Sequence, residues 1–568
     1  MSSTSAMRRS AARWLPTGAL LALLGILVIL PLGMLLYTAV LDNVPRPGAV
    51  RGNFTTEHFR SLASSSMLTA TRNSLIVGLG GTALALTFGA ALAWLGARTD
   101  VPGRWLVQLA GIVPLFVSSL VGALAWVLLL APRTGYINIV LEGVGIPSPF
   151  NAYSLATMVF IFGMYYAPYA FLFIYGALSL MNPDLEEAAR VHGASDRRTL
   201  RRITFPLVKP AVLSSALLIF ALVIENFPVP TILGSPSGIH TLPSYIYLLM
   251  NSAPPRANQA AAIGMLLLLT LMLVIFIQRK ILAQREYTTV TGKGIKPRRV
   301  ALGSWRWPAF GFCLMYIVLA VMLPFAALIM ASVRQNPFIG DIIDLADFSS
   351  FSFETFSDVI NYSSFQVGIK NSLLLGVLAA AVGGLLHTFM AFAVHRSKAP
   401  GRQLIDYIAV APVAVPAIVF GMGFLWTWFM LPIPIYGTLM ILVLAYVVIF
   451  MPQSYGAIAS SLRQIHPDLE ESAQVCGANK VRAGAKITLP LVRSGLVSAL
   501  LLIIILTMRE LSVAIFLVTA DTRVLSITIF DFWDSGLLNR AAAASVLYSL
   551  VLAAIALVAR RYLSAKAV

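Results

Sequence analysis

The chain has 568 residues, of which 58% are hydrophobic and only 11% are charged, with a formal net charge of +18 and a mean hydropathy of +0.84. This composition excludes an ordinary soluble globular protein and is typical of a chain that crosses a membrane many times. The only two cysteines, Cys313 in an apolar stretch and Cys476 in a polar one, predict neither a disulfide nor a thiolate metal site.

Twelve apolar stretches are long enough to cross a hydrocarbon core about 30 Å thick. In chain order we expect them at 15–41, 73–96, 105–131, 152–180, 210–233, 258–278, 307–333, 371–394, 403–431, 436–460, 494–520 and 541–559. The first is too long for a removable signal peptide and lacks the small-residue cleavage pattern, so we interpret it as a signal anchor. The sequence therefore predicts an all-α polytopic membrane protein.

The basic residues predict how these spans are oriented. Threading from a cytoplasmic N-terminus places most of the 41 Lys and Arg residues in cytoplasmic segments, whereas the acidic residues show no such bias. Both termini are therefore expected on the cytoplasmic side. The basic residues are spread over the cytoplasmic segments without an aromatic–basic face, so they reflect the topology and do not indicate nucleic-acid binding. The densest run, 279–306, is interpreted as a solvated linker beside anionic membrane lipid.

The chain is an internal duplication. Landmarks keep the same order in both parts: for example, Asn73-Ser74 and Asn371-Ser372 each open a span after a long outer segment, and we interpret each Asn as the N-cap of that span. Six spans per half imply two parallel halves related by a pseudo-twofold axis along the membrane normal. We expect a first half at 1–278, a cytoplasmic linker at 279–306 and a second half at 307–568.

A polar segment between apolar stretches occurs twice, at 182–209 and at 466–493. The shared positions are Pro183, Glu186, Glu187, Ala188, Ala189, Gly193 and Pro206 in the first copy and Pro467, Glu470, Glu471, Ser472, Ala473, Gly477 and Pro490 in the second. A proline at the first helical position, acids in the first turn and a glycine at the end predict a short helix. A second short helix should follow and stop at Pro206 or Pro490.

The pattern Glu-Ala-Ala, three residues, Gly, nine residues, Ile-x-Phe-Pro between Glu187 and Pro206 resembles the Glu-Ala-Ala loop of ABC importer permeases. The second copy runs from Glu471 to Pro490. Phe205 in place of the usual leucine and Ser472 in place of the second alanine are small departures. The flanking spans match a permease half in order and length. Fold and function are therefore expected to be those of a type I ABC importer permease with two fused halves, most like the ferric-iron importer type.

The resemblance implies the partners of this chain. The two loops would be coupling helices docked on two copies of an ABC ATPase subunit, which carry ATP and Mg. No cofactor and no catalytic residue are expected on this chain, since it has no phosphate-binding loop. A periplasmic or extracellular solute-binding protein would deliver the substrate at the outer segments 42–72 and 334–370, the second of which is acidic. The protein would lie in the bacterial inner membrane.

Few ionisable residues sit inside the predicted spans, among them Glu225, Arg509 and Glu510. A charge at such depth costs about 3 kcal/mol unless it is paired or faces water, so these residues are functional candidates. Two interpretations stay open and are compatible: the residues line the translocation path, or they form an ion cluster that locks the two halves together. Carboxylates near the axis favour a cationic substrate, and no metal site is expected.

Other functions also stay open. The same machinery could carry thiamine, a polyamine or a phosphonate-type solute. A secondary transporter with six-plus-six spans is the alternative of another class, because residues 96–104 loosely resemble a loop of that superfamily. That class has no reason to duplicate a Glu-Ala-Ala-Gly loop, and an ion channel would need a pore-loop signature.

Overall fold

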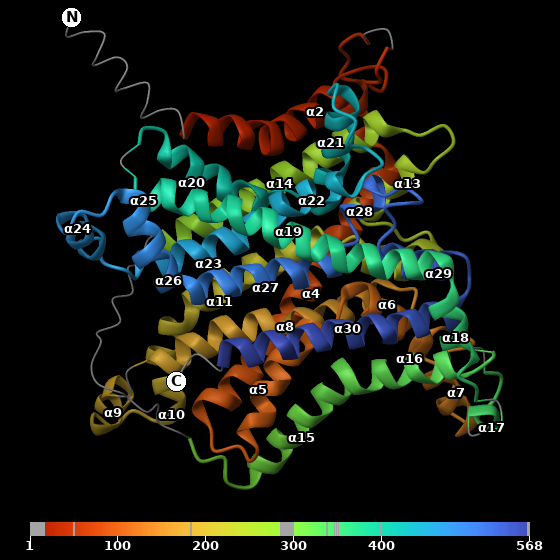
Figure 1. Cartoon of the computed structure of the whole chain (residues 1–568). Coiled ribbons are helices and arrows are strands. Elements are labelled where there is room, and N and C mark those ends of the chain that lie inside the picture. Colours follow the sequence, from red (N-terminus) through yellow and green to blue (C-terminus); the bar gives the residue numbers. More distant parts are fainter. Residues whose placement is uncertain are drawn as a thin grey trace, which may run out of the picture.

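The computed structural model describes residues 17–48, 52–181, 184–283, 300–336, 339–345, 347, 349, 351–397 and 399–564. Almost all of them are helical (Figure 1). The β-structure of the described residues is limited to three isolated bridges between pairs of residues. The predicted all-α fold is confirmed.

The helices follow one order in both halves; η marks a 3₁₀ or π turn. Those of the first half are η1 (Gly25–Ile29), α2 (Leu30–Ala39), α3 (Glu57–Arg60), η2 (Ser61–Ala63), α4 (Ser65–Arg98), α5 (Arg104–Ile112), η3 (Val113–Phe116), α6 (Ser119–Leu130), α7 (Tyr136–Gly143), α8 (Leu155–Leu180), α9 (Asp184–Val191), α10 (Asp196–Thr199), η4 (Leu200–Thr204), α11 (Phe205–Ile224), α12 (Pro228–Gly234), η5 (Ser235–Ser237), α13 (Leu242–Met250) and α14 (Ala257–Ala283).

Those of the second half are η6 (Gly303–Trp305), α15 (Arg306–Ile317), η7 (Val318–Met322), α16 (Leu323–Val333), α17 (Ile342–Leu345), α18 (Glu354–Asn361), α19 (Ser363–His395), α20 (Arg402–Val410), η8 (Ala411–Ala414), α21 (Ala417–Met430), α22 (Leu439–Ile449), α23 (Met451–Arg463), α24 (Asp468–Val475), α25 (Lys480–Ala483), η9 (Gly484–Thr488), α26 (Leu489–Leu491), α27 (Arg493–Arg509), α28 (Ala514–Leu517), α29 (Leu525–Asp534) and α30 (Leu538–Ser564). The predicted linker 279–306 starts inside α14, and its residues 284–299 lie outside the described ones.

Among the described residues, eight helices are long and apolar enough to cross a membrane, and the number rises to twelve if four bent helix pairs each count as one span. The bends of 101°, 115° and 54° fall within the predicted spans three, nine and ten, whereas the bend of 71° follows Leu491, just before the predicted start of span eleven at 494. The expectation of twelve spans therefore agrees with the upper count.

Spans three and nine each bend just after a proline near their middle. Pro114 lies in η3 and Pro412 in η8, and in both the helix tightens into a 3₁₀ turn before the chain changes direction. A proline cannot donate the backbone hydrogen bond of a helix interior, and its ring crowds the preceding turn.

Spans five and eleven end earlier than the apolar pattern predicts. Helix α11 stops at Ile224 and not near 233, while α27 stops at Arg509 and not near 520. In the first half Pro228 starts the new helix α12, and in the second Glu510 has an extended backbone before α28. Glu225, Arg509 and Glu510 therefore lie at the broken ends of helices, where backbone groups lack helical partners.

The first span of each half packs against the other half. Helix α2 lies on α21 and on α14, and in the same way α15 and α16 lie on α5, α6 and α30. The approach of α2 to α21 is close: a Cβ atom at Gly423 would lie 2.4 Å from the Pro31 carbonyl oxygen. The halves are therefore interlocked and not merely side by side.

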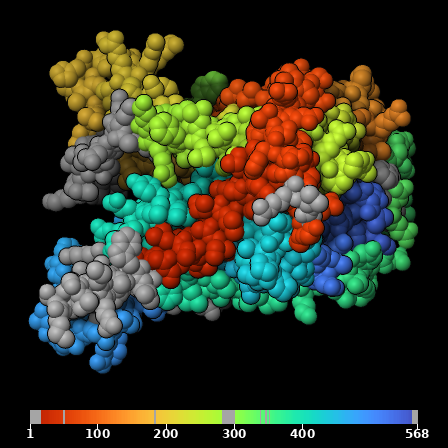
Figure 2. Space-filling model, turned by 90° about the horizontal axis from the view of Figure 1, so that it is seen from above, coloured from red at the N-terminus to blue at the C-terminus, as the bar shows by residue number. Residues whose placement is uncertain are grey.

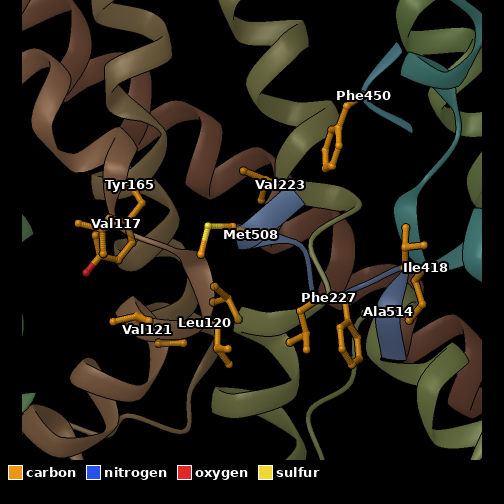
Figure 3. Packing of buried hydrophobic residues seen from close by; sticks show 14 of the residues in the cluster. Val117, Leu120, Val121, Tyr165, Val223, Phe227, Ile418, Phe450, Met508 and Ala514 are labelled. Atoms are coloured by element: carbon orange, nitrogen blue, oxygen red, sulfur yellow. The ribbon is translucent and has the colours of Figure 1, made fainter. Parts of the chain in front are cut away.

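One continuous apolar core runs through both halves. Figure 3 shows part of it, where Val223 and Phe227 of the first half lie in the same region as Met508 and Ala514 of the second. Aromatic rings also meet across the halves, with the centroids of Phe227 and Phe530 6.2 Å apart.

The two polar segments lie at one end of the molecule. In Figure 1 helices α9, α10, α24 and α25 occupy this end, while α7, α17, α18 and α29 occupy the opposite end, which we call the far end. Figure 2 shows the segments as two separate projections on the same side, the first in yellow and the second in blue.

Candidate functional site

Each polar segment forms a helix, a glycine turn and a second helix, as the sequence predicts. We call residues 184–204 the first repeat loop and 468–488 the second. Gly193 follows α9 with φ +76°, and Gly477 follows α24 with φ +91°. A residue with a side chain is strained in this left-handed conformation, so a glycine suits both turns.

The two ends of each loop differ from the expectation. Asn182 and Pro183, the expected start of the first short helix, lie outside the described residues, and Pro467 stands just before α24 and not in its first turn. The second short helix does not stop at Pro206, because α10, η4 and α11 form one continuous helix. At Pro490 the chain bends by 71° only after Leu491.

A π turn explains how a helix tolerates these prolines. In η4 the Phe205 N–H bonds the Leu200 carbonyl, and in η9 the Leu489 N–H bonds the Gly484 carbonyl. The wider turn moves the preceding carbonyls away from the proline ring that follows. The same turn also directs the last residue of each π segment toward its loop.

One acid of each loop points back into the protein. In the first loop the Thr204 hydroxyl donates to Glu186 Oε1 at 2.7 Å, and Arg98 Nη1 lies 3.4 Å from Glu186 Oε2. Arg98 is the last residue of α4 and only 1% exposed. The loop is therefore joined through one carboxylate to the second and fifth spans of its half.

The second loop repeats this arrangement. The Thr488 hydroxyl donates to Glu470, and Arg396 Nε lies 3.0 Å from Glu470 Oε1. Arg396 also donates to the carbonyls of Leu462 at 3.0 Å and Ile465 at 2.7 Å. Sequence reasoning missed Thr204, Thr488 and both arginines. The signal was present, since Arg98 and Arg396 each follow the second apolar stretch of their half.

The other acid of each loop is exposed. Glu187 and Glu471 face outward beside exposed apolar side chains, with Val191 86% exposed and Val475 88% exposed. Ala188 and Ser472 are likewise exposed, whereas Ala189 and Ala473 are half-buried. Both loops thus offer the same mixed acidic and apolar surface.

Arg509 joins the halves without an acidic partner. Its Nη1 donates to the Leu115 carbonyl at 2.7 Å and its Nη2 to the Val117 carbonyl at 3.1 Å. These carbonyls lie at the bend of span three of the first half, where helical partners are missing. Among the described residues no carboxylate lies within 4 Å of Arg509, so the ion cluster with Glu225 and Glu510, one of the two interpretations left open above, is not formed in this structure.

Glu510 acts as a helix cap in the structure. Its Oε1 accepts the Val513 N–H at 3.0 Å at the start of α28. Asn226 does the same in the first half, where its Oδ1 accepts the Val229 N–H at 3.1 Å at the start of α12. Sequence alignment of the halves pairs Glu225 with Arg509, and the matching caps agree with that pairing.

Polar side chains near Glu225 are only half-buried although they lie deep between the spans. They are Tyr166, Tyr169, Glu225, Asn226, Arg509 and Glu510. Asn226 Nδ2 donates to the Tyr166 hydroxyl at 3.1 Å, and the rings of Tyr166 and Tyr169 stack with centroids 5.8 Å apart. Within the described residues no group of three or more His, Cys, Asp and Glu side chains is arranged to hold a metal ion.

The Asn-Ser pairs do not cap their own spans, because α4 begins at Ser65 and α19 at Ser363. They hold a different helix. Asn73 Nδ2 donates to the His240 carbonyl at 3.0 Å, and Ser74 Oγ accepts the Leu242 N–H at 2.8 Å. Asn371 and Ser372 bond the start of α29 in the same way. Each pair therefore fixes the beginning of the helix between the fifth and sixth spans of its half.

The two outer segments share a plan at the far end. Each begins with an antiparallel bridge, Leu41 with Phe54 and Arg334 with Phe351, and continues into α3 or α18. Several acids of the second segment are engaged internally, such as Asp358, which lies 3.4 Å from Arg540.

Asp347 of the same segment accepts hydrogen bonds from the Ser349 hydroxyl at 2.6 Å and from the Ser349 N–H at 2.9 Å. These bonds lower the pKa of Asp347, because they stabilise the ionised carboxylate. The segment therefore remains negatively charged at neutral pH at this position.

Comparison with known proteins agrees with the duplication. A family model described as "binding-protein-dependent transport system inner membrane component" matches residues 81–286 and again residues 372–567. Each match contains one repeat loop. Together they cover more than half of the chain.

Two curated relatives are similar to the chain over most of its length. The putative ferric transport system permease protein FbpB 1 of Haemophilus influenzae is 26% identical over 476 residues, covering 82% of this chain and 72% of that protein. The ferric transport system permease protein FbpB of Actinobacillus pleuropneumoniae is 25% identical over 498 residues, covering 84% and 68%. A solved bacterial ABC transporter involved in the import of the acidic polysaccharide alginate aligns with TM-score 0.40 and 21% identity, over 50% of this chain and 100% of that chain.

Proposed function

The chain belongs to the family of binding-protein-dependent transport system inner membrane components, and we propose that it is the permease of an ATP-driven importer for ferric iron. The similarity to two ferric transport permeases over more than four fifths of the chain carries this proposal. Both repeat loops and both matched regions fit a transport subunit that is not itself an enzyme.

The repeat loops are proposed to dock on two copies of an ABC ATPase subunit. Their projection from one end of the molecule as two similar lobes supports a twofold partner (Figure 2). Glu187 and Glu471 supply a matched exposed carboxylate, and Val191 and Val475 supply matched exposed apolar surface. ATP and Mg would be bound by the partner and not by this chain.

The substrate path is proposed to pass Glu225 in the middle of the membrane. Glu225 is half-buried and its carboxylate has no hydrogen-bond or ion-pair partner among the described residues, in contrast to Glu510, which caps α28. A carboxylate held at this depth would attract a cation. Arg509 would join the two halves beside this path, through its hydrogen bonds to the carbonyls of span three. Glu510, which caps α28, is proposed to lie at the edge of the path.

The far end is proposed to face the periplasm and to receive a solute-binding protein on the outer segments 42–72 and 334–370. The loop end would then face the cytoplasm together with both termini. The similar plan of the two outer segments supports a partner with two lobes, one on each half.

The test uses the complete complex, with ATPase subunits and binding protein, in proteoliposomes. We expect ATP-dependent uptake of radioactive ferric iron that Glu187→Arg together with Glu471→Arg abolishes, because charge reversal adds repulsion where the ATPase docks. Glu142→Arg, which reverses an exposed acid at the far end, should leave co-purification of the ATPase subunits unchanged and is the matched control for docking.

Other outcomes separate the alternatives. ATP-dependent uptake of thiamine, a polyamine or a phosphonate in place of ferric iron would show that the proposed substrate is wrong, while the proposal of an ATP-driven importer would stand. Uptake without ATP or ATPase subunits would indicate a secondary transporter and overturn the whole proposal.

A further inference from the structure

Each repeat loop is joined to the membrane helices by one arginine, one glutamate and one threonine, at matching positions in the two halves. In the first half these are Arg98, Glu186 and Thr204, and in the second Arg396, Glu470 and Thr488. We propose that these two triads, named here the first and second triad, are positioning residues that transmit the movement of each loop to the spans. This inference rests on the proposed function, because it assumes that an ATPase moves the loops.

Each triad connects three separate pieces of chain through one carboxylate. In the first triad one oxygen of Glu186 accepts from Thr204, at the entrance to α11, and the other lies next to Arg98, at the end of α4. Helices α4 and α11 also pack on each other along their length. A displacement of the loop therefore pulls on two packed spans at the same time.

Burial makes the link strong. The side chain of Arg98 is 1% exposed and that of Glu186 14%, and Arg98 Nε and Nη2 have no hydrogen-bond partner among the described residues. A buried guanidinium that loses its only carboxylate would be left uncompensated, which is far less favourable than breaking an exposed ion pair. The contact should therefore persist while the loop moves.

The threonines are placed by the π turns. Thr204 ends η4 with 3% exposure and Thr488 ends η9 fully buried, and both donate to their loop carboxylate. An unbroken α-helical turn would rotate these hydroxyls away from the acids, because a π turn contains one additional residue. The π turns at both matched places also accommodate the proline two residues later, so one local feature both tolerates the proline and aims the hydroxyl at its acid.

The triads face the membrane body and the docking residues face outward, so the two roles can be separated by mutation. Glu186 and Glu470 touch the spans, whereas their neighbours Glu187 and Glu471 are exposed. A triad variant should leave ATPase docking intact. It should change how much substrate is moved for each ATP that is hydrolysed.

The experiment compares the complete wild-type complex in proteoliposomes with Thr204→Val combined with Thr488→Val. Ferric iron uptake and ATP hydrolysis are measured in the same vesicles. We expect ATP hydrolysis and co-purification of the ATPase to be retained, while uptake per ATP falls about tenfold for each of the two hydrogen bonds removed, the factor that corresponds to one hydrogen bond of ordinary strength. Ser214→Ala is the matched control, since Ser214 lies on the same continuous helix outside the loop, is 1% exposed, and its hydroxyl has no partner among the described residues.

A charge exchange provides the second test. Glu186→Arg should uncouple uptake from hydrolysis, and adding Arg98→Glu should restore at least part of the coupling, because the ion pair is rebuilt with its sign reversed. Unchanged uptake per ATP in the threonine variant would overturn the proposal. Loss of the assembled complex in the threonine variant, or no rescue by the exchange, would also overturn it by showing that the triads only support the fold.

These outcomes are distinct from failure of the proposed function. A wild-type complex that takes up no ferric iron would refute the substrate. Normal wild-type uptake together with unaltered variants would refute only the triads.

Discussion

The two halves carry prolines at matched positions and respond to them differently. Pro168 lies inside the continuous helix α8, whereas its counterpart Pro452 follows a 54° bend between α22 and α23. Pro206 lies inside a continuous helix, whereas the chain bends by 71° just after Pro490. A proline therefore permits a bend in these spans without imposing one.

The neighbouring span explains the first of these differences. Gly89 of α4 lies against α8, and a Cβ atom at this position would be 2.5 Å from both the Ala167 carbonyl oxygen and the Ala170 Cβ. The matching residue in α19 is His387, which is fully buried and hydrogen-bonded to Ser454, the counterpart of Ala170. A glycine and an alanine allow two straight helices to touch, while a histidine and a serine need room. The size of the side chains between the two neighbouring helices therefore decides whether the helix bends at its proline.

The largest loss of stability is expected from Gly89→His, which places in the first half the residue that the second half carries at the matching position, His387. Because backbone atoms of α8 lie within 3 Å of the new Cβ, α4 and α8 would have to separate, at a cost of more than about 4 kcal/mol. We expect loss of monodisperse protein in size-exclusion chromatography of a fluorescent fusion. A well-behaved variant would mean that α8 bends readily and would contradict the steric explanation.

A smaller loss is expected from His387→Ala. Removing the buried ring leaves a cavity and deprives Ser454 of its partner, at a cost of about 2 to 3 kcal/mol. Thermal unfolding in detergent should show a lower midpoint, and Ser454→Ala, which removes only the hydrogen bond, should lower it less. Equal effects of the two variants would show that the ring is not what keeps the helices apart.

A matched pair of glycines should respond with opposite sign. A Cβ at Gly78 would lie 2.9 Å from the Phe220 ring, whereas at the counterpart Gly376 the nearest atom, of Ile504, is 3.5 Å away. We expect Gly78→Ala to destabilise by about 1 kcal/mol, and Gly376→Ala to be neutral or stabilising by up to about 1 kcal/mol, since alanine favours a helix. Thermal unfolding of both variants gives the comparison, and the same sign in both would contradict it.

The smallest effect is expected from Pro452→Ala. If His387 holds the helices apart, the bend between α22 and α23 should persist without the proline and stability should change by less than about 1 kcal/mol. The distance between spin labels on α22 and α23 measures the bend. A straightened helix would show that the proline and not the histidine maintains it.

Sequence reasoning could predict the elements of this fold but not their breaks. Apolar length and basic-residue bias reveal where spans occur, because burial in lipid acts on every residue of a span. Breaks depend on contacts between distant helices. Nothing in the sequence near Pro168 and Pro452 distinguishes the straight span from the bent one, since the deciding residues, Gly89 and His387, lie in other spans.

In the candidate site, too, the local elements could be predicted from the sequence, whereas the contacts between distant residues could not. Repetition alone identified the loops, and Gly193 and Gly477 are turns as predicted. The partners of Glu186 and Glu470 escaped notice because Arg98 and Arg396 look like ordinary positive residues at a membrane boundary. Of the two interpretations of Arg509, the ion cluster is not formed because Arg509 binds backbone carbonyls at a bend, and a bend could not be located from the apolar pattern.

The interlocked first spans have a consequence for biosynthesis. Helix α2 leaves the ribosome long before α21, although part of the surface that it covers belongs to α21. Until α21 has been made, one face of α2 can meet only lipid. The first half therefore cannot complete its packing when its own synthesis ends. Helix α2 must remain incompletely packed in the bilayer until the ninth span, which contains α21, has been synthesised. Two halves made as separate polypeptides would each lack the neighbour of their first span that belongs to the other half, and would reach the native packing only after the two halves associate.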